Sequence, residues 1–120
     1  MLGALAVAAG GAAGSLLRYW ATLLAARWWG EAFPWGTIAI NVLGSFVIGW
    51  FASLPSSHET RLLVMTGLCG GFTTFSAFSL QTLDLLRAGD TLAAAANIAL
   101  SVVLCLAAVA AGHYLAVHTS

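Results

Sequence analysis

The sequence is short of charge. It has no lysine, four basic and four acidic residues in 120, so charged residues make up 7% of the chain and the formal net charge is zero. Soluble domains carry about 25% charged residues, which keep their surfaces hydrated. The scarcity of charge argues against nucleic acid or anionic lipid headgroups as the main partner. We therefore expect the chain to lie within a lipid bilayer.

Residues for catalysis and metal chelation are also scarce. The two cysteines, Cys69 and Cys105, lie in apolar stretches without CxxC spacing. The three histidines lack the spacing of metal ligands: His58, His113 and His118. The sequence shows no serine-histidine-acid set, no phosphate loop and no pair of carboxylates inside the apolar segments. These absences favour a protein that is not an enzyme.

Apolar residues fill most of the chain, at 61% of the total. A membrane-spanning helix needs roughly 20 apolar residues, and four such segments with short connections use nearly the whole length. We predict an all-α integral membrane protein with a single four-span domain over residues 1–120. Its spans are expected at residues 2–26, 35–54, 60–87 and 91–116. The first has no basic region before it, so it is read as a span rather than a signal peptide.

The centre of the third span has an unusual composition, because residues 67–79 read GLCGGFTTFSAFS. Adjacent glycines and threonines weaken a helix, and we predict a break near residues 70–74, at mid-membrane depth. Unwound backbone is tolerated in a bilayer only where its polar groups are satisfied. A hard cation such as sodium, bound by carbonyl oxygens, would satisfy them. The alternative is a glycine-rich notch for helix packing.

Aromatic and hydroxyl side chains alternate beside the predicted break. Phe72, Phe75 and Phe78 recur every three residues, which would place them along one helical face. Hydroxyl-bearing residues lie between them: Thr73, Thr74, Ser76 and Ser79. Ring edges are electropositive and hydroxyls donate hydrogen bonds, so both suit a small, hard anion. The alternative for this stripe is lipid contact or core packing, which is the more usual role of aromatic residues in membrane helices.

Two further polar sets recur at intervals of four residues, so each occupies one helical face. They are Thr37, Asn41 and Ser45 in the second span, and Asn97, Ser101 and Cys105 in the fourth. Each set alone could simply form hydrogen bonds between helices. Two such sets beside a broken helix favour a polar path for an ion.

The arginines bear on orientation and on function. Arg18 lies inside the first span, where an arginine is costly, so it either marks function near a pore mouth or extends its side chain to the interface. Arg61 lies on one side of the membrane, and Arg27 and Arg87 on the other, a bias of one charge. Such a chain could insert in both orientations. Two copies could then pair as an antiparallel homodimer.

Three segments resemble the CrcB (Fluc) family of fluoride channels. They are GTIAINVLG at residues 36–44, GSLLR at residues 14–18 and GGFTTFSAFS at residues 70–79. The last is highly specific, and the resemblance covers essentially the full length. It implies a dual-topology homodimer in the inner cell membrane, with two pores that export fluoride passively and lower its cytoplasmic concentration. It also implies a structural sodium ion at the dimer centre that is not transported.

The same resemblance assigns roles to individual residues. It places the sodium ion on the backbone carbonyls of Gly70 and Thr73 from both subunits, the fluoride-facing ring edges on Phe75 and Phe78, and an amide donor on Asn41. Arg18 corresponds to an arginine near the aqueous vestibule. The positions that correspond to a polar track along the pore are Thr37, Asn97, Ser101 and Cys105.

Three positions depart from the family pattern. Position 97 is asparagine where some members have tyrosine, position 105 is cysteine where a hydroxyl can stand, and Gln81 replaces an acid found in others. The main alternative is a small dual-topology exporter of the multidrug-resistance kind, which should carry a glutamate within the membrane. The first span here has no acidic residue. A purely structural subunit would leave the TTFSAF segment without a purpose.

Overall fold

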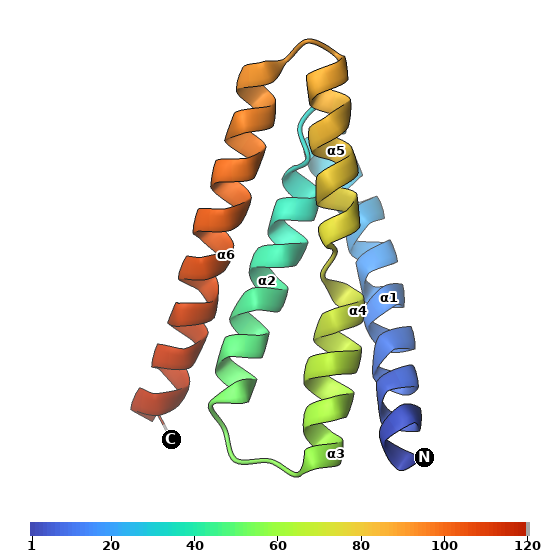
Figure 1. Cartoon of the computed structure of the whole chain (residues 1–120), viewed down its shortest axis with the longest axis vertical. Coiled ribbons are helices and arrows are strands. Elements are labelled where there is room, and N and C mark those ends of the chain that lie inside the picture. The colour runs from blue at the N-terminus through green and yellow to red at the C-terminus, as the bar shows by residue number, and fades with distance from the viewer. Residues whose placement is uncertain (120) are drawn as a thin grey trace.

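The chain forms four long helical segments that run back and forth between two ends of the molecule (Figure 1). The computed structural model describes residues 1–119. The segments are α1 (Leu2–Trp29), α2 (Trp35–Ala52), a composite third segment (His58–Arg87) and α6 (Thr91–Thr119). No strand occurs among residues 1–119. All four segments are long and apolar enough to cross a membrane, which confirms the prediction of an all-helical chain with four apolar helices.

The third segment is built from several helical pieces. They are α3 (His58–Arg61), the π-helix η1 (Leu62–Cys69), α4 (Gly70–Phe72) and α5 (Phe75–Arg87). Ser57 caps the start, because its Oγ accepts the Thr60 N–H at 3.2 Å. Thr73 and Thr74 separate α4 from α5 with extended backbone, at φ −81°, ψ 158° and φ −150°, ψ 114°. The glycines at 70 and 71 remain helical, so only the two threonines leave the helix.

Glycines let α1 lie directly against the third segment. Gly10 and Gly14 are both buried, and a Cβ at Gly10 would collide with the carbonyl oxygen of Leu63. A Cβ at Gly14 would collide with the carbonyl oxygen of Leu68. Close backbone approach between small residues is a common way for helices to associate in lipid. The glycine pair thus sets the distance between α1 and the third segment.

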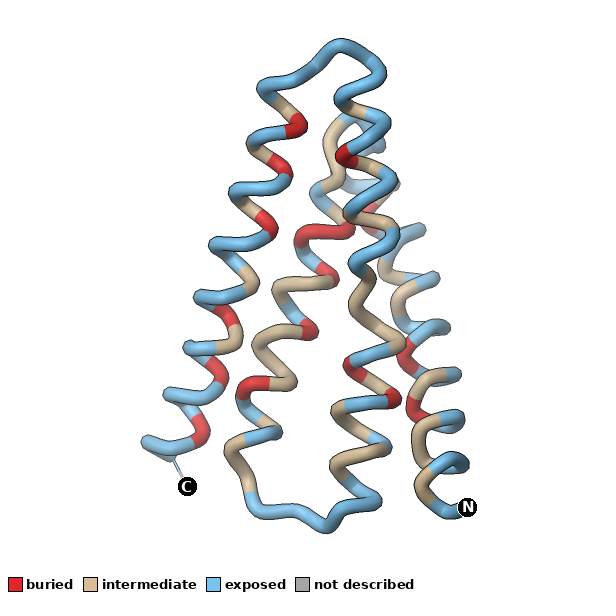
Figure 2. Tube along the Cα trace, viewed as in Figure 1, coloured by how far each residue is buried: buried red, intermediate tan, exposed pale blue. Residues whose placement is uncertain are grey.

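Small residues also form the contact between α2 and α6. A Cβ at Gly49 would collide with the backbone of Val109, and one at Gly112 with that of Phe46. Buried positions follow the inward faces of the helices, while exposed positions follow the outward faces (Figure 2). Many exposed side chains are large and apolar, including Trp20 at 56% exposure. Such an outer surface suits lipid better than water.

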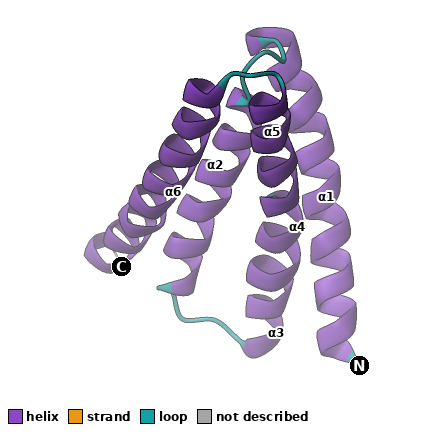
Figure 3. Cartoon of the chain, turned by 45° about the horizontal axis from the view of Figure 1, so that its top comes forward, coloured by secondary structure: helices purple, strands orange, loops and turns teal. Residues whose placement is uncertain are grey.

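The connecting loops divide the arginines between the two ends. The α1–α2 and α5–α6 loops gather at one end, as the tilted view shows (Figure 3). Arg27 and Arg87 lie in the last turns of α1 and α5, next to these loops. Arg61 lies at the opposite end, at the close of α3. These loop-proximal arginines therefore differ in number by one between the two ends, which is the bias that the sequence indicates.

Candidate functional site

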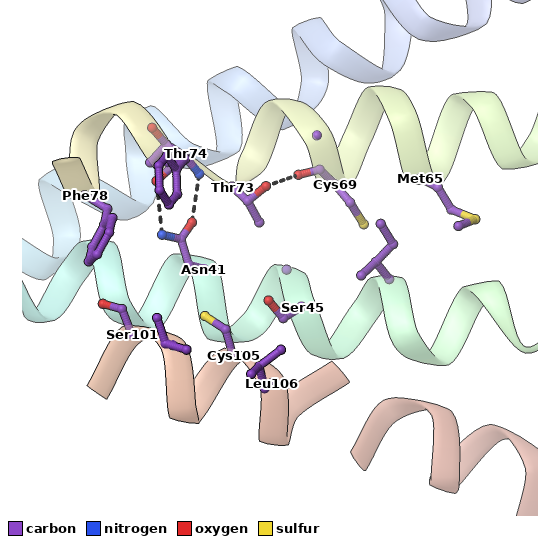
Figure 4. A pocket seen from close by; sticks show the side chains of 15 residues that line it. Asn41, Ser45, Met65, Cys69, Thr73, Thr74, Phe78, Ser101, Cys105 and Leu106 are labelled. Atoms are coloured by element: carbon purple, nitrogen blue, oxygen red, sulfur yellow. Dashed lines mark hydrogen bonds between the residues drawn. The ribbon is translucent and has the colours of Figure 1, made fainter. Parts of the chain in front are cut away.

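Asn41 of α2 holds the interrupted backbone of the third segment through both ends of its amide. Its Nδ2 donates to the carbonyl oxygen of Thr74 at 3.1 Å, and its Oδ1 accepts the Thr74 N–H at 2.7 Å (Figure 4). A side-chain amide has the donor and the acceptor that one extended peptide requires. Asn41 thus replaces the bond that the Thr74 N–H would have made in a continuous helix, and it adds a donor to the Thr74 carbonyl.

The interruption leaves several carbonyl groups without their usual helical donors, and those of Gly70 and Thr73 are among them. In a continuous α-helix the Thr74 N–H would bond to Gly70 and the Ala77 N–H to Thr73. Instead, Thr74 donates to Asn41, and Ala77 donates to the Thr74 hydroxyl oxygen at 3.1 Å. The carbonyl oxygens of Gly70 and Thr73 are thereby free to accept other partners. Carbonyl oxygens in this state suit a hard cation.

Arg18 of α1 also binds backbone at the interruption. Its Nε donates to the carbonyl oxygen of Gly71 at 3.0 Å, and the side chain is half-buried. The normal donor to this carbonyl would come from Phe75, the first residue of α5. Arg18 therefore donates a hydrogen bond to the interrupted backbone, a contact that the sequence did not predict.

A groove of about 410 Å³ lies along the interruption, between the third segment, α2 and α6. Eight predicted site residues line it: Asn41, Gly70, Thr73, Thr74, Phe75, Phe78, Ser101 and Cys105. The other lining residues are Gly44, Ser45, Ile48, Met65, Cys69, Val102 and Leu106. None of these side chains carries a formal charge. The groove thus joins a mainly apolar wall to a few neutral polar groups (Figure 4).

Two phenylalanine rings stand together at one end of the groove. The centroids of Phe75 and Phe78 are 5.3 Å apart, with the rings tilted by 47°. Phe75 is 78% exposed. Phe72 lines a different hollow, with Leu17 and Leu43. The expectation that all three rings share one face was wrong, because the extended threonines between positions 72 and 75 break the helical periodicity.

The remaining predicted site residues lie outside this groove: Arg18, Thr37, Ser76, Ser79 and Asn97. Thr37 borders a second hollow of about 350 Å³ beside the α1–α2 loop, together with Gln81 and Asp84. Ser76 and Ser79 are exposed on α5. The Ser79 hydroxyl donates to the carbonyl one turn earlier, at 2.9 Å. Asn97 of α6 is 1% exposed, and its side chain points toward α5.

The sequence matches one family of proteins over most of its length. Residues 5–113 match the family described as "CrcB-like protein, Camphor Resistance (CrcB)". The chain belongs to the CrcB family. Similar CrcB relatives are found in Methylocella silvestris (55% identical over 115 residues; 90% of this chain, 88% of the relative) and Rhodospirillum rubrum (54% over 114; 89% and 88%). Each of these relatives is named "Fluoride-specific ion channel FluC".

A third CrcB relative, from Opitutus terrae, carries the same name and is 54% identical over 119 residues, covering 92% of this chain and 89% of the relative. These matches confirm the family that the motifs indicated. Together with the four long apolar helices, they make the chain a multi-pass membrane protein.

Two features of this CrcB chain were missing from the predicted site. Cys69 and Met65 line the groove, but neither was among the predicted site residues. Thr82 of α5 is 9% exposed and accepts a hydrogen bond from Asn97. Its position four residues after Phe78 places it on the same helical face, and this spacing was the available signal.

Proposed function

We propose that this CrcB chain is a subunit of a fluoride-selective ion channel that exports fluoride passively across the inner membrane and so lowers its cytoplasmic concentration. The observation that carries the proposal is the groove along the interrupted helix, where the amide of Asn41 and the rings of Phe75 and Phe78 lie together. The names of the relatives support the same ion and a channel rather than an enzyme.

The chemistry of the groove fits a small anion. Ring edges and hydroxyl groups replace the water contacts that a dehydrated anion loses. Neutral donors do this without holding the ion so tightly that it cannot leave. The absence of charged side chains among the lining residues also separates this groove from that of a proton-coupled exporter, which needs an acidic residue for exchange.

We propose that a second, antiparallel copy of the chain covers the groove. Lipid cannot donate hydrogen bonds to the freed carbonyls of Gly70 and Thr73 or to the other polar groups that line it. The high exposure of Phe75 also fits a ring that a partner covers. The small arginine bias between the two ends permits both insertions. The interruption lies at the middle of the 30-residue third segment, which supports a break at mid-membrane depth.

We propose further that a structural sodium ion, which is not transported, binds at the two-fold axis of this dimer. The carbonyl oxygens of Gly70 and Thr73 fit the role, because both have lost their helical donors to Asn41 and to the Thr74 hydroxyl. Each subunit would supply the same pair. When bound, the ion would supply positive charge in a region of low dielectric constant.

The other predicted residues extend the proposed pathway from the groove toward its ends. Ser101 and Cys105 continue it along α6 within the groove, and Thr37 lies in the second hollow. The further residues assigned to the pathway or its vestibule are Thr74, Ser76, Ser79, Asn97 and Arg18. Fluoride, a second copy of the chain and the lipid bilayer are thus the proposed partners.

Anion efflux from liposomes tests the proposal. Purified dimers are reconstituted with fluoride or chloride inside, in sodium and in sodium-free buffer, and protein-free liposomes serve as the control. We expect rapid fluoride efflux with negligible chloride efflux, and slower fluoride efflux after sodium is removed. Verified dimers that release no fluoride would contradict the proposed function. Efflux that never depends on sodium, even after unfolding and refolding without it, would contradict the sodium site alone.

A further inference from the structure

A chain of side-chain hydrogen bonds joins α6 to α5 next to the groove. Ser101 donates from Oγ to Asn97 Oδ1 at 3.3 Å, and Asn97 donates from Nδ2 to Thr82 Oγ1 at 2.9 Å. Thr82 in turn donates to the carbonyl oxygen of Phe78 at 2.8 Å. Asn97 is 1% exposed, and Thr82 and Ser101 are 9% and 7% exposed. The bonds from Ser101 to Asn97 and from Asn97 to Thr82 are thus buried, and the bond from Thr82 to Phe78 is partly buried.

The number of protons that each group can donate fixes the direction of every bond in this hydrogen-bond chain. Thr82 has one hydroxyl proton and gives it to the Phe78 carbonyl, so its oxygen must accept from Asn97. This requirement orients the amide, with Nδ2 toward α5 and Oδ1 toward α6. Oδ1 is then the acceptor for Ser101. Each of the two halves of the Asn97 amide therefore has one defined partner.

The two residues at the ends of this hydrogen-bond chain line the groove, but the two residues in its middle do not. Phe78 and Ser101 line the groove from α5 and α6, whereas Asn97 and Thr82 do not. We propose that Asn97 is a positioning residue that acts through Thr82. Its amide fixes the helical turn that carries the Phe78 ring relative to the helix that carries the Ser101 hydroxyl. This inference rests on the proposed fluoride pathway, and it replaces direct ion contact as the role of Asn97.

The geometry also affects the Ser101 hydroxyl itself. Its proton points toward Asn97, and the 3.3 Å bond is longer than the usual range for hydroxyl donors, which ends near about 3.0 Å. An anion in the groove offers a stronger acceptor than a neutral amide oxygen. The hydroxyl can therefore turn toward a passing anion and return to Asn97 afterwards, while the bond from Asn97 to Thr82 keeps the two helices in register.

Substitution of Thr82 tests the proposal without changing a groove residue. Thr82→Val keeps the shape of the side chain but leaves Asn97 Nδ2 without its acceptor, and Thr82→Ser keeps the hydroxyl. Thr119→Val is a matched control, because Thr119 also bonds to the carbonyl one turn earlier, at an exposed site at the end of α6. Fluoride efflux per reconstituted dimer is measured for each variant, together with its thermal stability in detergent.

We expect Thr82→Val to reduce fluoride efflux by about tenfold or more, as small displacements in a functional site commonly do. Thr82→Ser should restore most of the efflux, and Thr119→Val should match the wild type. A merely structural role for Thr82 would lower stability without this loss of efflux per folded dimer.

The double variant Asn97→Leu/Thr82→Val keeps the test decisive if Thr82→Val does not fold, because it removes both partners of the buried bond between these two residues. Only the Ser101 hydroxyl, which lines the groove, then needs another acceptor. The double variant should fold and show about the same loss as one single variant, because the two residues act as one unit. Wild-type efflux from folded dimers of the double variant or of Thr82→Val would overturn the positioning role. Absence of fluoride efflux from the wild type itself would overturn the proposed function, and this inference with it.

Discussion

Asn41 is the side chain whose loss should most directly change the shape of the third segment. Asn41→Ala removes the bonds at 3.1 Å and 2.7 Å to the Thr74 peptide. An unpaired buried polar group costs about 1–3 kcal/mol, whereas side-chain hydrogen bonds in membrane proteins average about 0.6 kcal/mol because alternative partners are found. A loss near 2 kcal/mol for the two bonds lies between these limits.

In Asn41→Ala, the helix backbone itself offers the Thr74 N–H an alternative acceptor. Without Asn41, the Thr74 N–H can return to the Gly70 carbonyl, and the third segment can close into a continuous helix. A change of about 2 kcal/mol shifts this equilibrium about thirtyfold. We therefore expect Asn41→Ala to lower fluoride efflux from liposomes by up to about thirtyfold, with folding and dimer formation checked by size-exclusion chromatography.

The isosteric variant Asn41→Asp separates geometry from charge. Its carboxylate can still accept the Thr74 N–H but has no donor for the Thr74 carbonyl, and it sets a negative charge beside the proposed anion path. Fluoride efflux should be blocked. Wild-type efflux from folded Asn41→Ala dimers, or robust conduction in Asn41→Asp, would refute the idea that this amide holds the path open.

Three further predictions concern the rings, the helix contact and the arginine. Phe75→Ile and Phe78→Ile should each lower fluoride efflux about fivefold, the equivalent of about 1 kcal/mol of ring-edge interaction, without disrupting the dimer; unchanged efflux in both would remove the rings from the mechanism. Gly14→Val should destabilise the fold by about 3 kcal/mol through overpacking against the third segment, seen as a lower thermal unfolding temperature, and wild-type stability would contradict the packing. Arg18→Gln should lower efflux about tenfold by weakening the charge-assisted bond to Gly71, and wild-type efflux would show that this bond is dispensable.

Local composition was sufficient to predict most of the helical architecture. Four apolar stretches gave four helices, and the glycine and threonine cluster marked where the third is interrupted. The helix ends were harder to place. α1 continues through Trp29 because no breaker occurs before Gly30, whose φ of 70° suits glycine. Arg27 and the neighbouring tryptophans are tolerated in its last turn. The π-helical stretch before Gly70 had no recognisable signature.

The partners of polar side chains could not be predicted, because they depend on how the helices pack. Asn41 and Thr74 are 33 residues apart, and Arg18 and Gly71 are 53 apart. Periodicity places a side chain on a helical face but does not say which neighbouring helix it meets. Asn97 illustrates the point: it shares a face with Ser101, but it bonds to α5 outside the groove.

The most direct test of the central claim is the electrical current through the protein in a planar bilayer with fluoride and chloride on both sides, in opposite concentration gradients. A passive fluoride channel should carry current whose reversal potential follows the fluoride gradient and does not change when a pH gradient is added. Absence of current, or a reversal potential that follows the proton or chloride gradient, would contradict the account and favour a coupled exporter or another ion.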